Sequence, residues 1–162
     1  MKGTHTLIAQ ILIAQILLLL LSLVGAGIAL YLTSVHYANV PLLCSAQGFV
    51  DCQRVTSSVY SVVPGTSIPI TVPGLGWAIV SALLVIVGLG TRSNYRRLVL
   101  AQCIWSFLAL IVVLYLVYVE LVLLHTLCAW CTGLHVVVLI TFLIAMHQLL
   151  FLQGFKSGWA SG

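Results

Sequence analysis

Four long apolar runs constrain this chain more than any other feature of its sequence. They cover about residues 7–32, 74–90, 98–122 and 128–152. A helix needs roughly 17–25 apolar residues to cross a bilayer, and each run meets this requirement. Only 5% of the 162 residues are charged, whereas about 25% is usual in a soluble domain. The sequence therefore predicts an all-α membrane protein, a bundle of four transmembrane helices in a single domain over residues 1–162.

The first apolar run could be mistaken for a secretory signal, because Lys2 precedes it. The apolar core of such a signal is about 7–15 residues long, whereas this run has about 26 residues. More apolar sequence also follows the small residues at Gly25–Gly27. We therefore expect this run to be a retained transmembrane helix.

The basic residues predict the orientation of the bundle. Five of the six occur at the two termini or between the second and third runs: Lys2, Lys156, Arg92, Arg96 and Arg97. An even number of spans places these sites on one side of the membrane, and the positive-inside rule makes that side cytoplasmic. Only Arg54 lies on the other side. The basic residues do not cluster with aromatics, so the charge pattern does not indicate nucleic-acid binding.

The long connection over residues 33–73 is polar enough to leave the bilayer on the outer side. It contains Cys44 and Cys52, whose thiols are close enough in sequence to form a disulfide. Residues 53–60 are expected to form a short helix. Residues 66–72 are apolar but interrupted by proline, and we expect them to lie on the membrane surface as a lid.

The motif Cys128-Ala-Trp-Cys131 lies at the start of the fourth run. At a helix N-terminus, free amide groups and the helix dipole stabilise a thiolate, which is the form that attacks disulfides. Trp130 suits the membrane–water boundary, where indole rings collect. With a second cysteine pair on the same oxidising side, the motif predicts thiol–disulfide exchange. A static disulfide and a four-cysteine zinc site are alternatives, although zinc sites usually have short spacings in both halves.

Ser58 and His135 are candidates for binding an oxidant. If the intervening residues are helical, Ser58 lies one to two turns beyond Cys52, and its hydroxyl can hydrogen-bond a carbonyl oxygen. His135 follows Cys131 by four residues and shares its helical face, where a polar ring is costly unless it is used. The alternatives are a solvated loop serine and a histidine that is satisfied by the surrounding protein.

Three other reactive side chains receive less specific interpretations. Glu120 and His125 lie near the outer end of the third run, and we expect them to be interfacial rather than catalytic. Cys103 lies near the inner end of that run and is expected to pack as a small apolar side chain. The remaining three histidines show no metal-ligand spacing.

Taken together, the sequence resembles the vitamin K epoxide reductase family and its bacterial homologues. The resemblance extends over nearly the whole chain and depends on Cys44-x7-Cys52, Val55, Ser57, Ser58, Tyr60 and Cys128-x2-Cys131. The disulfide bond formation protein B family has the same parts, but it places the CxxC motif first. The order found here favours the vitamin K epoxide reductase family.

The resemblance implies a membrane oxidoreductase that passes electrons from thiols to a quinone and so supports disulfide bond formation. Cys44 and Cys52 would accept electrons from a thioredoxin-like partner. Cys52 would then attack Cys128 and free Cys131 to reduce menaquinone, ubiquinone or a vitamin K-type quinone, without a metal. The expected quinone-binding residues are Ser58, His135 and Trp130.

Two departures from the mammalian enzymes refine this hypothesis. His135 replaces a tyrosine, and residues 69–76 contain no counterpart of a pocket asparagine. Both differences favour plain quinone reduction over epoxide reduction, in a bacterial inner-membrane enzyme with a separate soluble partner. Alternatives are an endoplasmic reticulum vitamin K epoxide reductase, and a non-enzymatic membrane protein whose cysteines only form staples or bind metal.

Overall fold

The computed structural model describes residues 2–44, 48–91 and 94–160. Within these ranges, side chains are described only between residues 9 and 154. The helices in chain order are α1 (Lys2–Ala38), α2 (Cys52–Thr56), the 3-10 helix η1 (Val59–Ser61), α3 (Thr71–Gly90), α4 (Tyr95–Tyr118), the π-helix η2 (Val119–Leu123) and α5 (Ala129–Ala160). Four segments are long and apolar enough to cross a membrane: α1, α3, α4 continued by η2, and α5. The expected four-helix membrane fold is confirmed.

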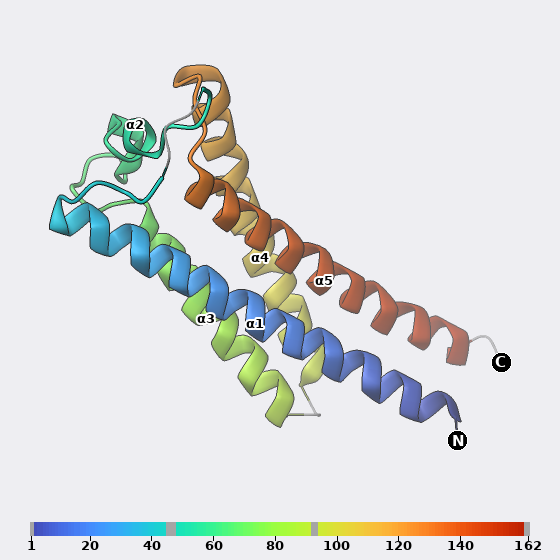
Figure 1. The fold of residues 1–162 in the computed structure, drawn as a ribbon. Helices are drawn as coiled ribbons and strands as arrows, with labels where there is room; N and C mark the ends of the chain where they lie inside the picture. Colours follow the sequence, from blue (N-terminus) through green and yellow to red (C-terminus); the bar gives the residue numbers. More distant parts are fainter. Residues whose placement is uncertain (1, 45–47, 92–93, 161–162) are drawn as a thin grey trace.

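The four long helices form a closed ring, in which α1 packs against α3 and α5, and α4 packs against the same two helices. Figure 1 shows both chain termini at one end of the bundle, together with the end of α3 and the start of α4. Helices α2 and η1 lie at the other end, which we call the outer end after the orientation predicted from the sequence. Arg92 and the side chains of Lys2 and Lys156, which the orientation prediction used, lie outside the described residues.

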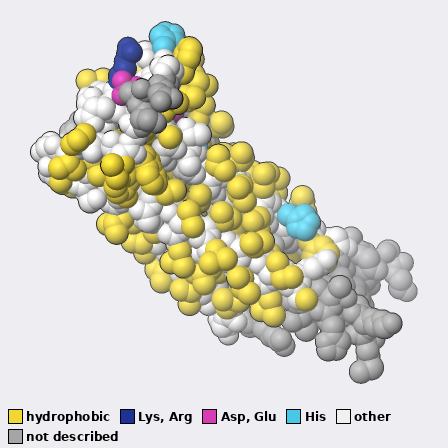
Figure 2. All heavy atoms as spheres, in the orientation of Figure 1, with side chains coloured by type: hydrophobic (Ala, Val, Ile, Leu, Met, Phe, Trp, Pro, Cys, Tyr) yellow, Lys and Arg dark blue, Asp and Glu magenta, His cyan; other side chains and the backbone are white. Residues whose placement is uncertain are grey.

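The bundle is apolar on its surface, as expected of a protein whose solvent is lipid. Leu30, Leu114 and Leu150 come from three different helices, and each is between 57% and 61% exposed. Figure 2 shows apolar side chains over the long body of the molecule, whereas the Lys, Arg, Asp and Glu side chains visible on this face lie at the outer end. A lipid-facing body with a polar cap accounts for this pattern.

The interior of the bundle contains small and weakly polar side chains. Four of them are fully buried: Ser22, Ser81, Ser106 and Thr141. Small residues let membrane helices approach closely, since no apolar driving force pulls them together in lipid. At Gly25 a Cβ atom would lie 3.3 Å from Cγ1 of Val137 on α5. The close contact of α1 with α5 therefore depends on glycine.

At the outer end of the bundle, two helix boundaries lie more than two residues from those expected from hydrophobicity. Helix α1 continues past residue 32 to Ala38, and the hydroxyls of Thr33 and Ser34 donate to carbonyls of their own helix at 2.7 Å each. Helix α3 begins at Thr71 and so includes two residues expected in the lid. Pro73 is compatible with this early start, since the first turn of a helix needs no amide donors.

The connection after α1 folds compactly. The expected helix over residues 53–60 is split into α2 and η1, because the hydroxyls of Ser57 and Ser58 bond back to nearby carbonyls at 2.7 Å and compete with helical pairing. Residues 61–70 form a small hairpin with a bridge between Val62 and Pro69. This hairpin includes residues 66–70, which are most of the segment that we expect to lie on the membrane surface as a lid.

Candidate active site

Backbone pairing between the loop and the segment before α5 brings the two cysteine pairs together. Val50 and Leu127 form an isolated parallel bridge. The Asp51 N–H donates to the Leu127 carbonyl at 3.0 Å, and the Leu127 N–H donates to the Phe49 carbonyl at 2.8 Å. The next residue after each paired segment is a cysteine. The bridge therefore holds the second loop cysteine beside the first cysteine of the CxxC motif.

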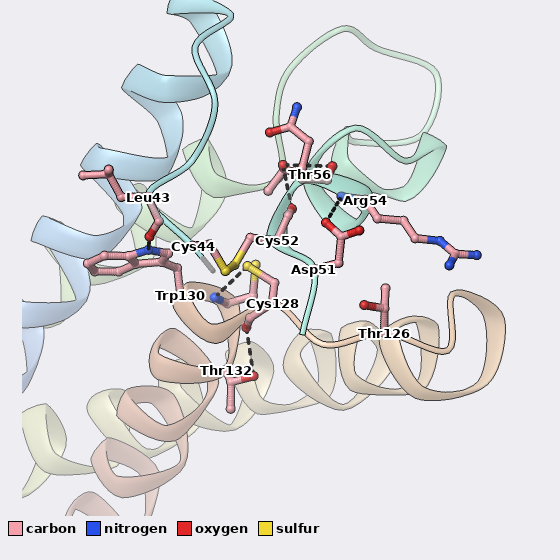
Figure 3. The surroundings of a disulfide bond; sticks show 12 residues. Leu43, Cys44, Asp51, Cys52, Arg54, Thr56, Thr126, Cys128, Trp130 and Thr132 are labelled. Atoms are coloured by element: carbon pink, nitrogen blue, oxygen red, sulfur yellow. Dashed lines mark hydrogen bonds between the residues drawn. A yellow bond between two sulfur atoms is a disulfide. The ribbon is translucent and has the colours of Figure 1, made fainter. Parts of the chain in front are cut away.

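Figure 3 shows the cysteines in this arrangement. Cys44 and Cys52 form a disulfide with their Cα atoms 6.1 Å apart, and the Cys128 side chain points toward it. Cys52 is 1% exposed and Cys128 is 0% exposed. Cys128 and Cys131 are free thiols. One pair is thus oxidised and the other reduced, and the facing sulfur atoms are shielded from water.

The segment that carries Cys44 is held by aromatic side chains. The Trp130 indole N–H donates to the Leu43 carbonyl at 3.1 Å, and the Leu43 N–H donates to the Tyr31 hydroxyl at 3.2 Å. The rings of Tyr31 and Trp130 are in contact, with centroids 4.9 Å apart. Trp130 therefore contacts the loop next to Cys44, and it is not among the residues that line the cavity described below.

The position of Cys52 is determined by a helix cap. The Asp51 side chain accepts a hydrogen bond from the Arg54 N–H at 3.0 Å, so α2 begins at Cys52. An aspartate at this position satisfies an amide that has no partner within the helix. The Thr56 hydroxyl also donates to the Cys52 carbonyl at 2.9 Å. Cys52 is consequently held on a short ordered turn rather than in a free loop.

The CxxC motif lies in and just before the first turn of α5. The Cys131 N–H donates to the Cys128 sulfur at 3.3 Å, and the Thr132 hydroxyl donates to the Cys128 carbonyl at 2.9 Å. The hydrogen bond with the Cys131 side chain lowers the pKa of the Cys128 thiol, and this effect outweighs the opposing effect of burial. A lowered thiol pKa increases the fraction of thiolate, the form that is active in exchange.

A cavity of about 230 Å³ lies next to the CxxC motif at the outer end. It is enclosed by the end of α1, by α2 and η1, and by the outer ends of the long helices. Its polar lining includes Ser58, Tyr60, Glu120, Cys131 and His135. Cys131 reaches this cavity, whereas Cys128 is not among the lining residues. The two cysteines of the motif therefore face different surroundings: Cys128 faces the loop disulfide, and Cys131 faces the cavity.

A second, apolar cavity of about 540 Å³ adjoins the first one. It lies between α3, α4 and α5 and is lined by side chains such as Trp77, Trp105 and Val138. Six residues line both cavities: Leu32, Ile70, Thr71, Leu116, Cys131 and His135. A small polar chamber thus continues into a larger apolar one. This shape suits a ligand with a polar ring and an apolar tail.

Two of the three expected quinone-binding residues line the polar cavity. His135 is 8% exposed and borders both cavities. Ser58 borders the polar cavity, and its hydroxyl donates to the Val55 carbonyl at 2.7 Å. That oxygen can still accept a hydrogen bond from a ligand. The third expected residue, Trp130, lies on the loop side of the motif.

Glu120 is the residue that sequence reasoning missed. It was expected to be interfacial, yet it is 2% exposed and lines the polar cavity. The π-helix η2 carries it, and the Thr126 N–H donates to its backbone carbonyl at 3.0 Å as the chain turns toward α5. His125 lies in this turn and is exposed, as expected. The available signal was that Glu120 is one of only two acidic residues in the chain.

The comparison with known families agrees with this geometry. The model of the vitamin K epoxide reductase family matches residues 16–146, which is most of the chain. The protein therefore belongs to the vitamin K epoxide reductase family, and membership indicates an oxidoreductase. A comparison with curated proteins finds no match. Within the described residues, no group of three or more His, Cys, Asp or Glu side chains could hold a metal ion.

Proposed function

We propose that the protein is a thiol:quinone oxidoreductase that supplies oxidising equivalents for disulfide bond formation. The observation that carries this proposal is that the Cys128 side chain points toward the Cys44–Cys52 disulfide, whereas Cys131 lines a cavity. A protein whose cysteines served only as staples would not need a cavity at one sulfur. The thiol donor would be a thioredoxin-like protein on the outer side of the bacterial inner membrane, and both termini would be cytoplasmic.

Electrons would pass in two exchange steps. A partner dithiol reduces the Cys44–Cys52 disulfide and becomes a disulfide itself. The Cys52 thiolate then attacks Cys128 in a Cys128–Cys131 disulfide, and Cys44 resolves the mixed disulfide. This leaves the loop pair oxidised and the CxxC pair reduced, which is the combination present in the structure. We propose that this combination is the form ready to reduce a quinone.

The quinone ring would occupy the polar cavity, and its tail would occupy the apolar cavity. His135 can donate a hydrogen bond to a quinone carbonyl, and the Ser58 hydroxyl lies in the same chamber. The position of Cys131 on both cavities supports electron donation at the point where ring and tail meet. Trp130 would act from the other side of the motif by keeping the Cys44 segment in place.

Reduction of vitamin K epoxide is a second candidate within the same family. The mammalian tyrosine is replaced by His135, and residues 69–76 contain no asparagine. For these reasons we propose a quinone, rather than its epoxide, as the substrate.

The experiment that tests the proposed function is quinone reduction by purified protein in detergent, with dithiothreitol as the electron source. Cys131→Ser should reduce the rate to background, a loss of at least about 100-fold, because it removes the sulfur that faces the cavity. Cys103→Ser is the matched control, since Cys103 is outside both cysteine pairs, and it should keep the wild-type rate. Menaquinone, ubiquinone and vitamin K analogues are compared, with vitamin K epoxide added as a further substrate.

Each outcome of this experiment is informative. Turnover that disappears only in Cys131→Ser supports the path from thiol to quinone. Turnover of the epoxide at a comparable rate would favour the epoxide reductase alternative. If folded wild-type protein reduces none of these substrates, the proposed function is wrong. Measuring the metal content of the same preparation would then distinguish a metal-binding protein from a stapled one.

A further inference from the structure

The carboxyl group of Glu120 lies inside the membrane-spanning part of the bundle. Glu120 belongs to the span Tyr95–Leu123 and is 2% exposed. The other acidic residue of the chain, Asp51, has a structural role as the cap of α2. An acidic side chain buried at membrane depth is costly and is usually retained for function. The capping role of Asp51 has no equivalent at Glu120, so the position of Glu120 needs another explanation.

The surroundings of this carboxyl group connect it to the redox pair. The Glu120 carboxyl group interacts with the backbone of Cys128. The second carboxyl oxygen, Oε2, is buried and has no hydrogen-bond partner. The charge of Glu120 acts on the sulfurs of both Cys128 and Cys131. Among the described residues, no other titratable group outside the pair acts on both sulfurs.

Glu120 also borders the place where the substrate would be reduced. It lines the polar cavity together with Cys131 and His135. The other titratable residues around this cavity are His36 on α1 and Tyr60 on η1. They come from elements that do not carry the redox pair. Glu120 therefore borders the cavity and also interacts with both thiols.

We infer that Glu120 is a catalytic residue, which takes a thiol proton from the redox pair and delivers it to a quinone oxygen. This inference rests on the proposed function, because it concerns the proton that accompanies the electrons. Thiols must lose their protons before the sulfurs can give up electrons, and quinone oxygens must gain protons to leave as hydroquinone. A buried site without bulk water needs a group that can carry a proton between these atoms.

The step balances as follows. The S–H bonds of Cys128 and Cys131 break, and one S–S bond forms between these cysteines. The two electrons pass to the quinone, and its two oxygens gain two protons to give hydroquinone. The Glu120 carboxylate accepts the Cys131 proton and releases it to an oxygen, so it ends in its starting form. The Cys128 proton then follows the same path through Glu120 to the other oxygen, because this carboxyl group interacts with both thiols.

The test separates the two half-reactions of the purified protein. Protein with a reduced CxxC pair is mixed with a soluble ubiquinone analogue, and the loss of quinone absorbance is followed in a single turnover. In a parallel assay, dithiothreitol reduces the Cys128–Cys131 disulfide, and the rate is measured by quenching and thiol alkylation. The variants are Glu120→Gln, which keeps the shape but cannot carry the proton, and Glu120→Asp, which keeps the carboxyl group.

Glu120→Gln should slow quinone reduction about 100-fold, within the range known for general acid–base catalysis, and should change the rate of the exchange half-reaction much less. Glu120→Asp should recover a large part of the lost rate. An unchanged rate of quinone reduction in folded Glu120→Gln would overturn the inference. Equal slowing of both half-reactions, in both variants, would also overturn it, because it would indicate a structural role. If wild type itself fails to reduce quinone, the proposed function is what fails.

Discussion

The two ends of the bundle both bury polar side chains, but the volume of the space that these side chains share differs greatly. At the outer end, Glu120 and His135 border a cavity of about 230 Å³. In the inner half, Gln15, Gln102 and Gln148 are 4–6% exposed and surround a space of only about 10 Å³. That space is close to the minimum for one water molecule. A buried polar residue in a membrane protein can therefore mark a site or a packing contact, and the adjoining volume distinguishes the two.

The inner polar group ties helices together. The Gln15 side-chain amide on α1 donates to the Tyr95 hydroxyl on α4 at 2.9 Å. It also donates to the side-chain oxygen Oε1 of Gln148 on α5 at 3.5 Å. Gln102 donates to the Ser106 hydroxyl at 3.4 Å within α4. These side chains contact one another across three helices. We therefore expect substitutions at the outer end to affect turnover, and substitutions in the inner half to affect stability.

The largest expected effect is at the outer end and depends on the electron donor. Cys44→Ala removes one cysteine of the loop pair that would accept electrons from the partner, and it leaves the CxxC pair and the cavity intact. Quinone reduction driven by a thioredoxin-like protein should fall at least about 100-fold. The rate driven by dithiothreitol should change little, because this small reagent can reach the CxxC pair directly once the loop disulfide is absent.

Comparing the two electron donors in one preparation provides the control for Cys44→Ala. Cys103→Ala should keep both rates, since Cys103 lies on α4 outside both pairs. Equal loss with both donors in Cys44→Ala would contradict the proposed division between a shuttle pair and a quinone-reducing pair. The outer end would then act as one unit.

A smaller effect is expected between the two regions, where α1 meets α5. Gly25→Val would place a side chain against Val137 and near Trp77 and Leu134, with the first Cβ contact at 3.3 Å. Overpacking of this kind typically costs about 1–3 kcal/mol. Gly27→Val is the matched control, because no atom lies within 4 Å of a Cβ at that position. Thermal unfolding in detergent should show a lower midpoint only for Gly25→Val, and equal midpoints would refute the tight helix contact.

The smallest expected effect is in the inner half. Gln15→Leu leaves the Tyr95 hydroxyl and the Gln148 side chain without their partner on α1. Hydrogen bonds between membrane helices contribute about 0.6 kcal/mol on average, so we expect a modest loss of unfolding stability. Gln10→Leu makes the same change on an exposed position of α1 and should have no such effect. Normal stability with abolished quinone reduction in Gln15→Leu would break the comparison between the two ends.

The sequence was sufficient to predict the fold because its evidence is spread over many residues. Four apolar runs define the spans, and no single side chain decides the result. The site was harder to predict. The spacing of Cys131 and His135 on one helix predicted that their side chains lie close together, because helical periodicity is regular. The positions of Trp130 and Glu120 depend on how a loop and a π-turn fold, and neither follows a regular period.

Glu120 illustrates this difference most clearly. By distance along the third run, it falls near the expected membrane surface, where water would solvate a carboxylate. The π-helix at Val119–Leu123 and the turn that follows it, whose Thr126 N–H donates to the Glu120 carbonyl, bury this position instead. Hydrophobicity along a sequence reports depth in the membrane, but it does not report which neighbouring segment covers a residue.

The short bridge between Val50 and Leu127 has a consequence for how such a protein can change over evolution. The bridge aligns the two cysteine pairs through N–H and C=O groups, which every residue except proline provides in full. The side chains of Val50 and Leu127 are therefore free to drift while the alignment persists, whereas Asp51 is also needed as the cap of α2. Selection would act at Leu127 mainly against proline, because its amide is a donor. Related chains can therefore keep the two cysteine pairs aligned even where the residues equivalent to Val50 and Leu127 are entirely different.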